Sequence, residues 1–479
     1  MPDSDLLPAL FLGMVVGIVG GLGACPQEAP TRPVASKPAT AKADTSTATS
    51  TVAPSAWSDS IQRFDNGFEM LIEPVQGSKV MGLFFFVKSG WDLDPLKRTG
   101  LAHCVEHMVM TAGTPGRKGG WRYRDWVQKR KHGANAMTRD RWTLYFSIGT
   151  REECSSDARW FAEILDGKGV FTDAQLARER QRVQSEVTNM TQYRPGGILQ
   201  WRARRLMLPG PPGRTGIGLA GDVDKIQLSE IQARVASTHH AGNVLCVAVG
   251  RVHAKRDLPF YKELFGSLPV RVTPKEVAWK PTEQVDAETV HPNVGAVFAS
   301  LAFVAPKSGS KDYPAWLLAS SWLVQRAMVE RKARGKQIEG MFFPAQYAFL
   351  ESPEILMLNL RGLDGQSESE VRKDLQEWVE KKRKARMGWA LLRSSQTSLR
   401  FFFPPHPLQR QDLAAFASFP RNLYRLGLSR GVSILRNIPG DMPRRLREVS
   451  AQSVSLALQK WLAPDRARFF ALLPKKPGK

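Results

Sequence analysis

Two histidines lie four residues apart in the segment His103-Cys104-Val105-Glu106-His107, and this spacing constrains the chain more than any other feature. On an α-helix, residues four apart share one face and lie one turn from each other. His103 and His107 could therefore hold one metal ion together, with the carboxylate of Glu106 beside it. Only 8 of the 479 residues are histidines, so a chance match to this pattern is improbable. The segment predicts a helix that carries a metal site.

Cysteine adds little to this site. Cys104 lies next to His103 in the sequence, so on a helix its side chain points about 100° away from that histidine and is not expected to bind the metal. Together with Cys154 and Cys246 it makes a set of three, which cannot form a complete disulfide framework. We expect all three to be buried free thiols.

A second helix is predicted from Phe171 to Gln192, where Thr172 and Gln175 form the pattern of a capping box. Along it, five residues at spacings of three and four form one stripe: Leu176, Glu179, Val183, Glu186 and Met190. Carboxylates on a core-facing stripe are costly unless they are paired or bind a metal. Two imidazoles leave a zinc site incomplete, so this helix is the best source of a third ligand. The alternative is a solvated face neutralised by neighbouring arginines, although these lie mostly off the stripe.

The surrounding segments read as strands. Asp65-Asn66-Gly67 is a hairpin-turn signal between two strand-like runs. The continuous apolar run from Val80 to Val87 predicts a strand that is covered on both faces. From Trp142 to Ile148 apolar residues alternate with Thr, Tyr and Ser. One face of this strand is expected to pack in the core and the other to be accessible.

The second half of the chain reads as a degenerate copy of the first. The apolar segment from Ala296 to Val304 matches the early buried strand, and the helical segment from Tyr313 to Met328 takes the place of the metal helix without any His or Glu. We therefore expect an α+β fold with two similar α/β-sandwich units in tandem, each a mixed or antiparallel sheet with helices packed on it. The expected domains are residues 57–270, which bind the metal, and residues 285–479, which do not.

These features resemble the pitrilysin/insulinase family of inverted zinc metallopeptidases, which includes mitochondrial processing peptidase and short bacterial two-domain members. The family motif is H-x-x-E-H followed by two glutamates seven apart, the later one some eighty residues downstream. Here Glu186 follows His107 by 79 positions and Glu179 by seven. The resemblance implies that His103, His107 and Glu186 bind one Zn²⁺ per chain. It also implies that Glu106 is the general base and that Glu179 supports the site without binding the metal.

Two further expectations rest on the same resemblance. Asn135 and Ala136 match the family's N-A-x-T before a strand, which implies that they bind the backbone of an extended peptide at a sheet edge. The family also places an Arg, and seven residues later a Tyr, in the C-terminal unit. Arg334 fits the first position and is expected to bind substrate, but Met341 stands at the second, and methionine cannot donate a hydrogen bond. We therefore expect a homologous partner subunit that supplies the Arg/Tyr pair in a heterodimer, with a homodimer as the alternative.

The N-terminal segment is expected to lie outside the fold. Residues 1–24 are largely apolar and resemble a bacterial lipoprotein signal peptide, in which Cys25 becomes the lipidated N-terminus, and residues 25–56 form a disordered linker. The expected location is the bacterial cell envelope, with a lipid anchor in the membrane and the protein facing the periplasm or the cell surface. The first five residues carry no Lys or Arg, unlike a usual export signal, so two alternatives stay open: a true start elsewhere, and an uncleaved membrane anchor.

The formal net charge of +23 favours acidic partners, but no nucleic-acid-binding motif is present and no nucleic acid is expected as a partner. The predicted function is that of a zinc-dependent endopeptidase acting on peptides or unfolded polypeptide segments. Two other classes stay open: a non-catalytic scaffold subunit that retains its zinc, and a basic module that binds anionic surfaces.

Overall fold

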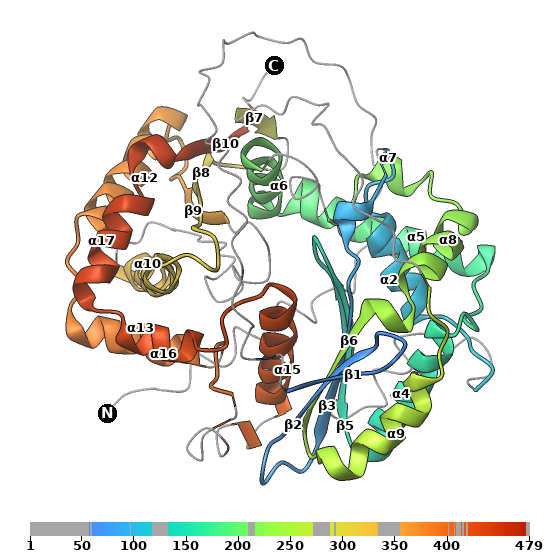
Figure 1. Cartoon of the computed structure of the whole chain (residues 1–479). Coiled ribbons are helices and arrows are strands. Elements are labelled where there is room, and N and C mark those ends of the chain that lie inside the picture. Colours follow the sequence, from blue (N-terminus) through green and yellow to red (C-terminus); the bar gives the residue numbers. More distant parts are fainter. Residues whose placement is uncertain are drawn as a thin grey trace, which may run out of the picture. The chain divides into compact units, whose positions relative to one another are not determined.

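The computed structural model describes residues 57, 60–95, 97–116, 133–208, 216–271, 288–291, 294–333, 355–400 and 420–475, with short pieces between 402 and 417. The predictions for Cys25, Arg334 and Met341 lie outside the described residues. Two sheets organise the described part, one from each half of the chain (Figure 1). No helix in this part combines the length and apolar character needed to cross a bilayer.

The first sheet has six strands in the order β1-β2-β6-β3-β5-β4. β2 and β6 run parallel, and the other neighbours run antiparallel. The turn signal at Asp65-Asn66-Gly67 is confirmed, because β1 and β2 form a hairpin around it and Gly67 has a φ of 84°. The strands are β1 Ile61–Arg63, β2 Glu69–Pro74, β3 Met81–Val87, β4 Ala134–Thr138, β5 Thr143–Gly149 and β6 Val244–Gly250.

The central strand β3 is buried on both faces, as its apolar run predicts. Leu83 and Phe85 point to one side and join a core formed with the helices of the first half. Phe84 and Phe86 point to the other side and join a separate core. The helices on the first side are α2 Leu101–Met110, α4 Arg151–Leu165, α5 Asp173–Thr188, α8 Leu228–Thr238 and α9 Ala254–Gly266.

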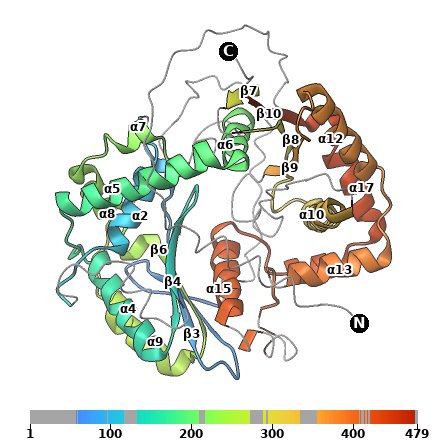
Figure 2. The same cartoon turned by 180° about the vertical axis from the view of Figure 1, so that it is seen from behind.

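The opposite face of this sheet is covered by α15 (Pro420–Leu435), a helix from the second half (Figures 1 and 2). Its close approach needs glycine, because a Cβ on Gly427 would lie 2.1 Å from a ring carbon of Phe84. On the apolar face of β5, Phe146 packs against Tyr424 of α15 with ring centroids 4.8 Å apart. The prediction that the other face of β5 is accessible is wrong, because Thr143, Tyr145 and Ser147 on that face are buried and Tyr145 joins the core of the first half. A local alternating pattern could not show that the two faces of β5 are covered by different parts of the chain.

A buried ion pair fixes α15 to the sheet. The guanidinium of Arg430 donates to both carboxylate oxygens of Glu73 on β2, with 2.7 Å between Nη2 and Oε1. Both side chains are almost fully buried. Arg430 also donates to the carbonyls of Pro404 and Pro405, so its fork of N–H groups has acceptors on several sides.

The second sheet has four described strands in the order β7-β10-β8-β9, and α6 (Pro195–Met207) of the first half packs on it. Ile198, Leu199 and Ala203 of α6 form a core there with residues of β8, β9 and β10. In the part of the chain that the structure describes, each half thus contributes a helix to the sheet of the other. The strands are β7 Glu288–His291, β8 Phe298–Val304, β9 Ile355–Arg361 and β10 Arg468–Pro474, and the neighbouring helices are α10 Tyr313–Ala333, α12 Glu368–Arg383, α13 Trp389–Arg400, α16 Met442–Glu448 and α17 Ala451–Trp461.

The second half repeats part of the order of helices and strands found in the first half, including the strand and helix that correspond to β3 and the metal helix α2. β8 leads into α10 as β3 leads into α2, and α17 leads into β10 as α8 leads into β6. Where α10 meets α13, a network of uncharged side chains is found: Gln325 donates to Ser398 at 3.4 Å and accepts from Ser394 at 3.1 Å. Hydroxyl and amide groups of this kind are not zinc ligands, so this contact is not a second metal centre.

Candidate metal centre

The helix that carries the motif begins at Leu101 because its N-terminus is capped from outside the helix. Gly100 has a φ of 88°, and the carboxylate of Asp94 accepts hydrogen bonds from the backbone N–H of Gly100 and of Ala102, both at 3.0 Å. A carboxylate at a helix N-terminus satisfies orphan N–H groups and complements the helix dipole. Arg234 of α8 holds Asp94 in place at 3.3 Å.

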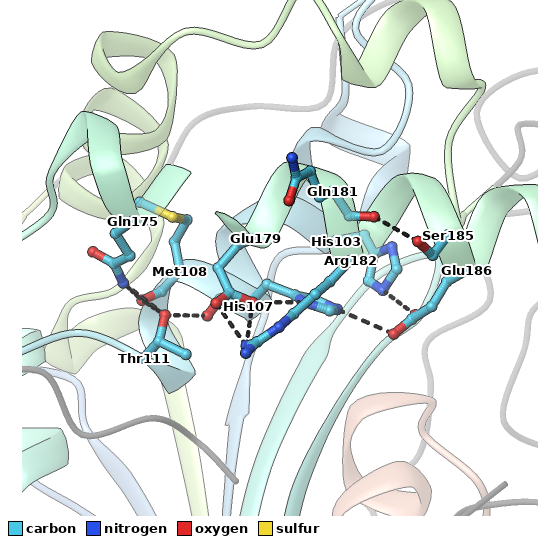
Figure 3. A network of polar contacts seen from close by, with 10 residues as sticks. All are labelled: His103, His107, Met108, Thr111, Gln175, Glu179, Gln181, Arg182, Ser185 and Glu186. Carbon is cyan, nitrogen blue, oxygen red and sulfur yellow. Dashed lines mark hydrogen bonds and ion pairs between the residues drawn. The ribbon is translucent and has the colours of Figure 1, made fainter. Parts of the chain in front are cut away.

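The second helix, α5, begins where the sequence predicts, at the N-cap Thr172, whose hydroxyl accepts from the backbone N–H of Gln175 at 3.2 Å. Of the two hydrogen bonds of a capping box, only this one is formed. The side-chain amide of Gln175 instead donates to the carbonyl of Met108 at 2.9 Å and to the hydroxyl of Thr111 at 2.7 Å. It therefore ties the start of α5 to the end of α2, and the two helices lie side by side (Figure 3).

Three predicted ligands meet between these helices. Nε2 of His103 lies 3.4 Å from one carboxylate oxygen of Glu186, and Nε2 of His107 lies 3.8 Å from the other. Their possible ligand atoms all lie within 4.8 Å of one another. Zinc bonds to nitrogen and oxygen of about 2.0–2.2 Å place tetrahedral ligand atoms about 3.3 Å apart. The spacing and the donor set of two imidazoles and one carboxylate both fit Zn²⁺.

The other nitrogen of each imidazole is held by a separate group. Nδ1 of His103 faces the carbonyl oxygen of Ile217 at 3.3 Å, and Nδ1 of His107 faces Oε2 of Glu179 at 3.3 Å. Each acceptor draws the proton to Nδ1 and leaves Nε2 for a metal. Glu179 is buried and also accepts from Arg182 at 2.7 and 3.0 Å. Figure 3 shows Glu179 and Glu186 on opposite sides of His107, with Glu186 also facing His103.

The histidines and carboxylates of the centre shift each other's pKa values. Burial disfavours the charged form of His103, but Glu186 and Glu106 outweigh it and raise the pKa of His103 to about 9. Burial likewise disfavours ionised Glu186, yet His103, His107 and Arg182 hold its pKa below the usual range. Cys104 is buried behind the site, and burial raises the pKa of its thiol. The prediction that all three described cysteines are buried free thiols is confirmed.

Glu106 lies on α2 between the two histidines and is 8% exposed. Its Oε2 accepts a hydrogen bond of 2.6 Å from the hydroxyl of Thr138, the last residue of β4. This bond fixes the carboxylate at the contact between α2 and β4. A carboxylate held beside a metal site in this way can take up a proton from a water molecule there.

Asn135 and Ala136 lie on the same strand as Thr138, at the edge of the first sheet. β4 lies at the edge of the sheet in the described order of strands, which is the position where a peptide can add as a further strand. The side-chain oxygen of Asn135 accepts from the backbone N–H of Ala136 at 2.9 Å. The structure thus brings the predicted peptide-binding strand to the metal helix.

Several supporting groups were not foreseen from the sequence. The carbonyl of Ile217 could not have been found, because every residue carries such a group. Asp94 and Thr138 gave weak signals, as an acid shortly before a helix and a hydroxyl at a strand end. Gly100 and Gly218 approach each other so closely that a Cβ on either would lie 2.9 Å from the Cα of the other. Gly100 stands directly before the motif helix, and an isolated glycine at such a position can mark a close approach of two backbones.

The histidine pair at residues 239 and 240 does not form a second centre. His239 is buried, and its Nε2 lies 3.0 Å from the hydroxyl of Tyr145 while its Nδ1 lies 3.0 Å from the hydroxyl of Thr238. Burial lowers the pKa of His239 to about 3. Among the described residues, only His103, His107 and Glu186 form a group able to hold a metal ion.

No family model and no curated protein matches the chain. Solved structures do match. A protease from Helicobacter pylori is 18% identical with a TM-score of 0.69, and the match covers 86% of this chain and 99% of that one. The inactive domain of a peptidase M16 from Pseudomonas fluorescens is 18% identical with a TM-score of 0.66, over 88% and 98%. The periplasmic protease PqqL from Escherichia coli is 15% identical with a TM-score of 0.62, over 86% of this chain and 47% of that one. The chain therefore has the fold of M16 peptidases, as its resemblance to the pitrilysin/insulinase family predicts.

Proposed function

We propose that the protein is a zinc-dependent endopeptidase that hydrolyses peptides or unfolded polypeptide segments. One observation carries the proposal: both Nε2 atoms of the motif face the carboxylate of Glu186, while Glu106 is held beside them by Thr138. The fold of M16 peptidases supports it. A structural ion pair would not need two imidazoles whose remaining nitrogens are each fixed by a separate acceptor.

His103, His107 and Glu186 would hold the metal ion. Bound there, Zn²⁺ would polarise the scissile carbonyl and lower the pKa of water at the site. Glu179 and Ile217 keep the imidazoles turned toward the ion. Arg182 donates two hydrogen bonds to Glu179, so this buried carboxylate has a cationic partner in addition to His107.

Glu106 is the general base. Its carboxylate accepts a proton from the attacking water and then delivers it to the nitrogen of the leaving amine. Thr138 donates to Oε2 of Glu106, which leaves Oε1 to face the reacting water. An extended substrate would lie along β4, where Asn135 and Ala136 pair with its backbone and bring the scissile bond next to Glu106.

A partner subunit completes the proposal. Met341 stands where the family has a hydrogen-bonding Tyr, so a second chain with an Arg/Tyr pair would supply the group that stabilises the developing oxyanion. In support, this chain spans about half the length of PqqL. The protein would be lipid-anchored through Cys25 in a bacterial cell envelope, which mass spectrometry of the mature N-terminus would test.

The test uses an unstructured peptide, zinc and the intact protein, with and without a co-purifying chain of similar size. We expect cleavage with the partner and little without it, and Glu106→Gln should lower the rate by about 10²- to 10⁴-fold with zinc still bound. Full activity of Glu106→Gln would contradict the proposal.

A second candidate is a zinc-retaining scaffold without activity. Met341 favours it, and so does the likeness to the inactive domain from Pseudomonas fluorescens. Stoichiometric zinc without cleavage by the complex with its partner would support this alternative.

A further inference from the structure

We propose that the contact between Gly100 and Gly218 is a positioning device for the metal centre, which sets the orientation of His103 through the carbonyl of Ile217. The inference rests on the proposed zinc site and adds to it a part of the chain that lies far from the motif in sequence. Its consequence is that the affinity for zinc depends on two glycines that do not touch the ion.

The two backbones approach more closely than any side chain would allow. Gly100 has a φ of 88° and Gly218 a φ of 95°, both in the left-handed region. A Cβ on Gly100 would lie 2.9 Å from the Cα of Gly218, and a Cβ on Gly218 would lie 2.9 Å from the Cα of Gly100. Real Cβ atoms essentially never come so close to backbone atoms, so a substitution at either position must push the segments apart.

Hydrogen bonds close the contact from the other side. The hydroxyl of Thr99 donates to the carboxylate of Asp222 at 2.7 Å and accepts from the backbone N–H of Leu219 at 3.0 Å. The backbone N–H of Thr99 donates to the same carboxylate at 3.2 Å. The segment before α2 is thus fastened to the residues on the C-terminal side of Gly218.

Ile217 directly precedes Gly218, so it borders this fastened segment, and its carbonyl oxygen reaches Nδ1 of His103 at 3.3 Å. A carbonyl oxygen only accepts hydrogen bonds, so Nδ1 must carry the proton, and the lone pair of the neutral ring is left on Nε2. Nε2 is the atom that faces Glu186. Because the bond is already 3.3 Å long, a shift of the segment by about 1 Å would break it. His103 would then lose both its fixed tautomer and its fixed ring orientation.

The sharpest test is Gly218→Ala, measured as the dissociation constant for zinc in competition with a chelator and as the unfolding temperature of the metal-free protein. Loss of a group that orients a metal-binding histidine typically weakens binding by about 10- to 100-fold, and we expect an effect in this range. Two alanine controls separate the effect of the backbone clash from the effects of an added methyl group and of a left-handed alanine. Gly221→Ala adds a methyl group close by, where nothing lies within 4 Å. Gly365→Ala adds one at a φ of 85°, also with nothing within 4 Å.

Both controls should bind zinc within about twofold of the wild type, and Gly365→Ala shows how much a left-handed alanine lowers the unfolding temperature by itself. Gly218→Ala that binds zinc as tightly as Gly365→Ala would overturn the inference. If Gly218→Ala does not fold, Thr99→Val tests the inference instead. It removes the hydrogen bonds of the hydroxyl with Asp222 and Leu219 and keeps nearly the same side-chain size. It should weaken zinc binding, whereas Thr99→Ser should restore it. Wild-type affinity in a folded Thr99→Val would also overturn the inference.

These outcomes are separable from failure of the proposed function. A wild type that binds no zinc would end the proposed peptidase activity and this inference together. A wild type that binds zinc, with variants that bind it equally well, would end this inference alone.

Discussion

Glu179 accepts a hydrogen bond from Nδ1 of His107 at 3.3 Å, and the same carboxylate accepts two more from Arg182. Glu179 is 3% exposed, so it is a buried anion with two cationic or polar donors and no solvent. This arrangement explains why two glutamates stand on the stripe of α5. Glu186 reaches the front of the histidine pair, whereas Glu179, two turns earlier, holds one ring from behind.

Glu179→Gln should weaken zinc binding by about tenfold, and Glu179→Ala by about 10- to 100-fold. The glutamine can still accept from His107, but it loses the charge that favours the Nδ1 proton. Glu263→Gln, at an exposed position on α9, is the matched control and should leave the affinity unchanged. Chelator competition measures all three. Equal affinities of Glu179→Ala and the wild type would show that His107 needs no support.

Thr138→Val should lower kcat/KM by about tenfold without loss of zinc, because the hydroxyl that fixes Glu106 is gone and the carboxylate can rotate away from the water. A tenfold effect corresponds to about 1.4 kcal/mol, close to the low end of the range for a hydrogen bond to a charged group. Thr138→Ser keeps the donor and should retain most of the activity. The comparison requires the active complex with its partner. Unchanged kcat/KM in Thr138→Val would remove this role.

Zinc affinity should rise with pH up to about 9. Burial favours the neutral form of His103, but Glu186 and Glu106 raise the pKa of His103 to about 9 in the metal-free protein. Binding at neutral pH must therefore displace a proton, and affinity should gain about tenfold per pH unit until the ring is neutral. The same charge stabilises the metal-free fold below pH 6.5, and this contribution is lost as the pH rises through 9. Dissociation constants measured between pH 6.5 and 10 test this, and a flat profile between pH 7 and 9 would contradict it.

Arg430→Met should lower the free energy of unfolding by about 3–5 kcal/mol, because it leaves Glu73 buried without its partner. Burial opposes ionisation of Glu73, but Arg430 and His406 hold the pKa of Glu73 at about 2. The stability from this carboxylate is present above pH 4.5 and is lost as the pH falls toward 2. Urea unfolding at pH 7 measures the effect. The double variant with Glu73→Gln should recover part of the loss, and a single variant as stable as the wild type would refute the role.

The sequence was sufficient for the features that repeat at short range. The spacing of His103 and His107, the stripe of α5 and the apolar run of β3 each depend on one local period, and each is found in the structure. The stripe of α5 limited the third ligand to Glu179 or Glu186, and the resemblance to the pitrilysin/insulinase family implied Glu186.

Features that depend on tertiary contacts could not be predicted. The cover of α15 over β5 and the pairing of Arg430 with Glu73 join residues hundreds of positions apart, and no local period marks them. The amide of Gln175 shows the same limit within the site. Its position fits a capping box, but the end of α2 lies close enough to accept its hydrogen bonds instead.

The central claim is that His103, His107 and Glu186 form one zinc site with Glu106 outside it. Zinc content after loading and desalting, measured in the wild type, Glu106→Gln and His107→Ala, tests it most directly. We predict one zinc per chain in the first two proteins and none in the third. A His107→Ala protein that folds and keeps its zinc, or a wild type that retains none, would contradict the account.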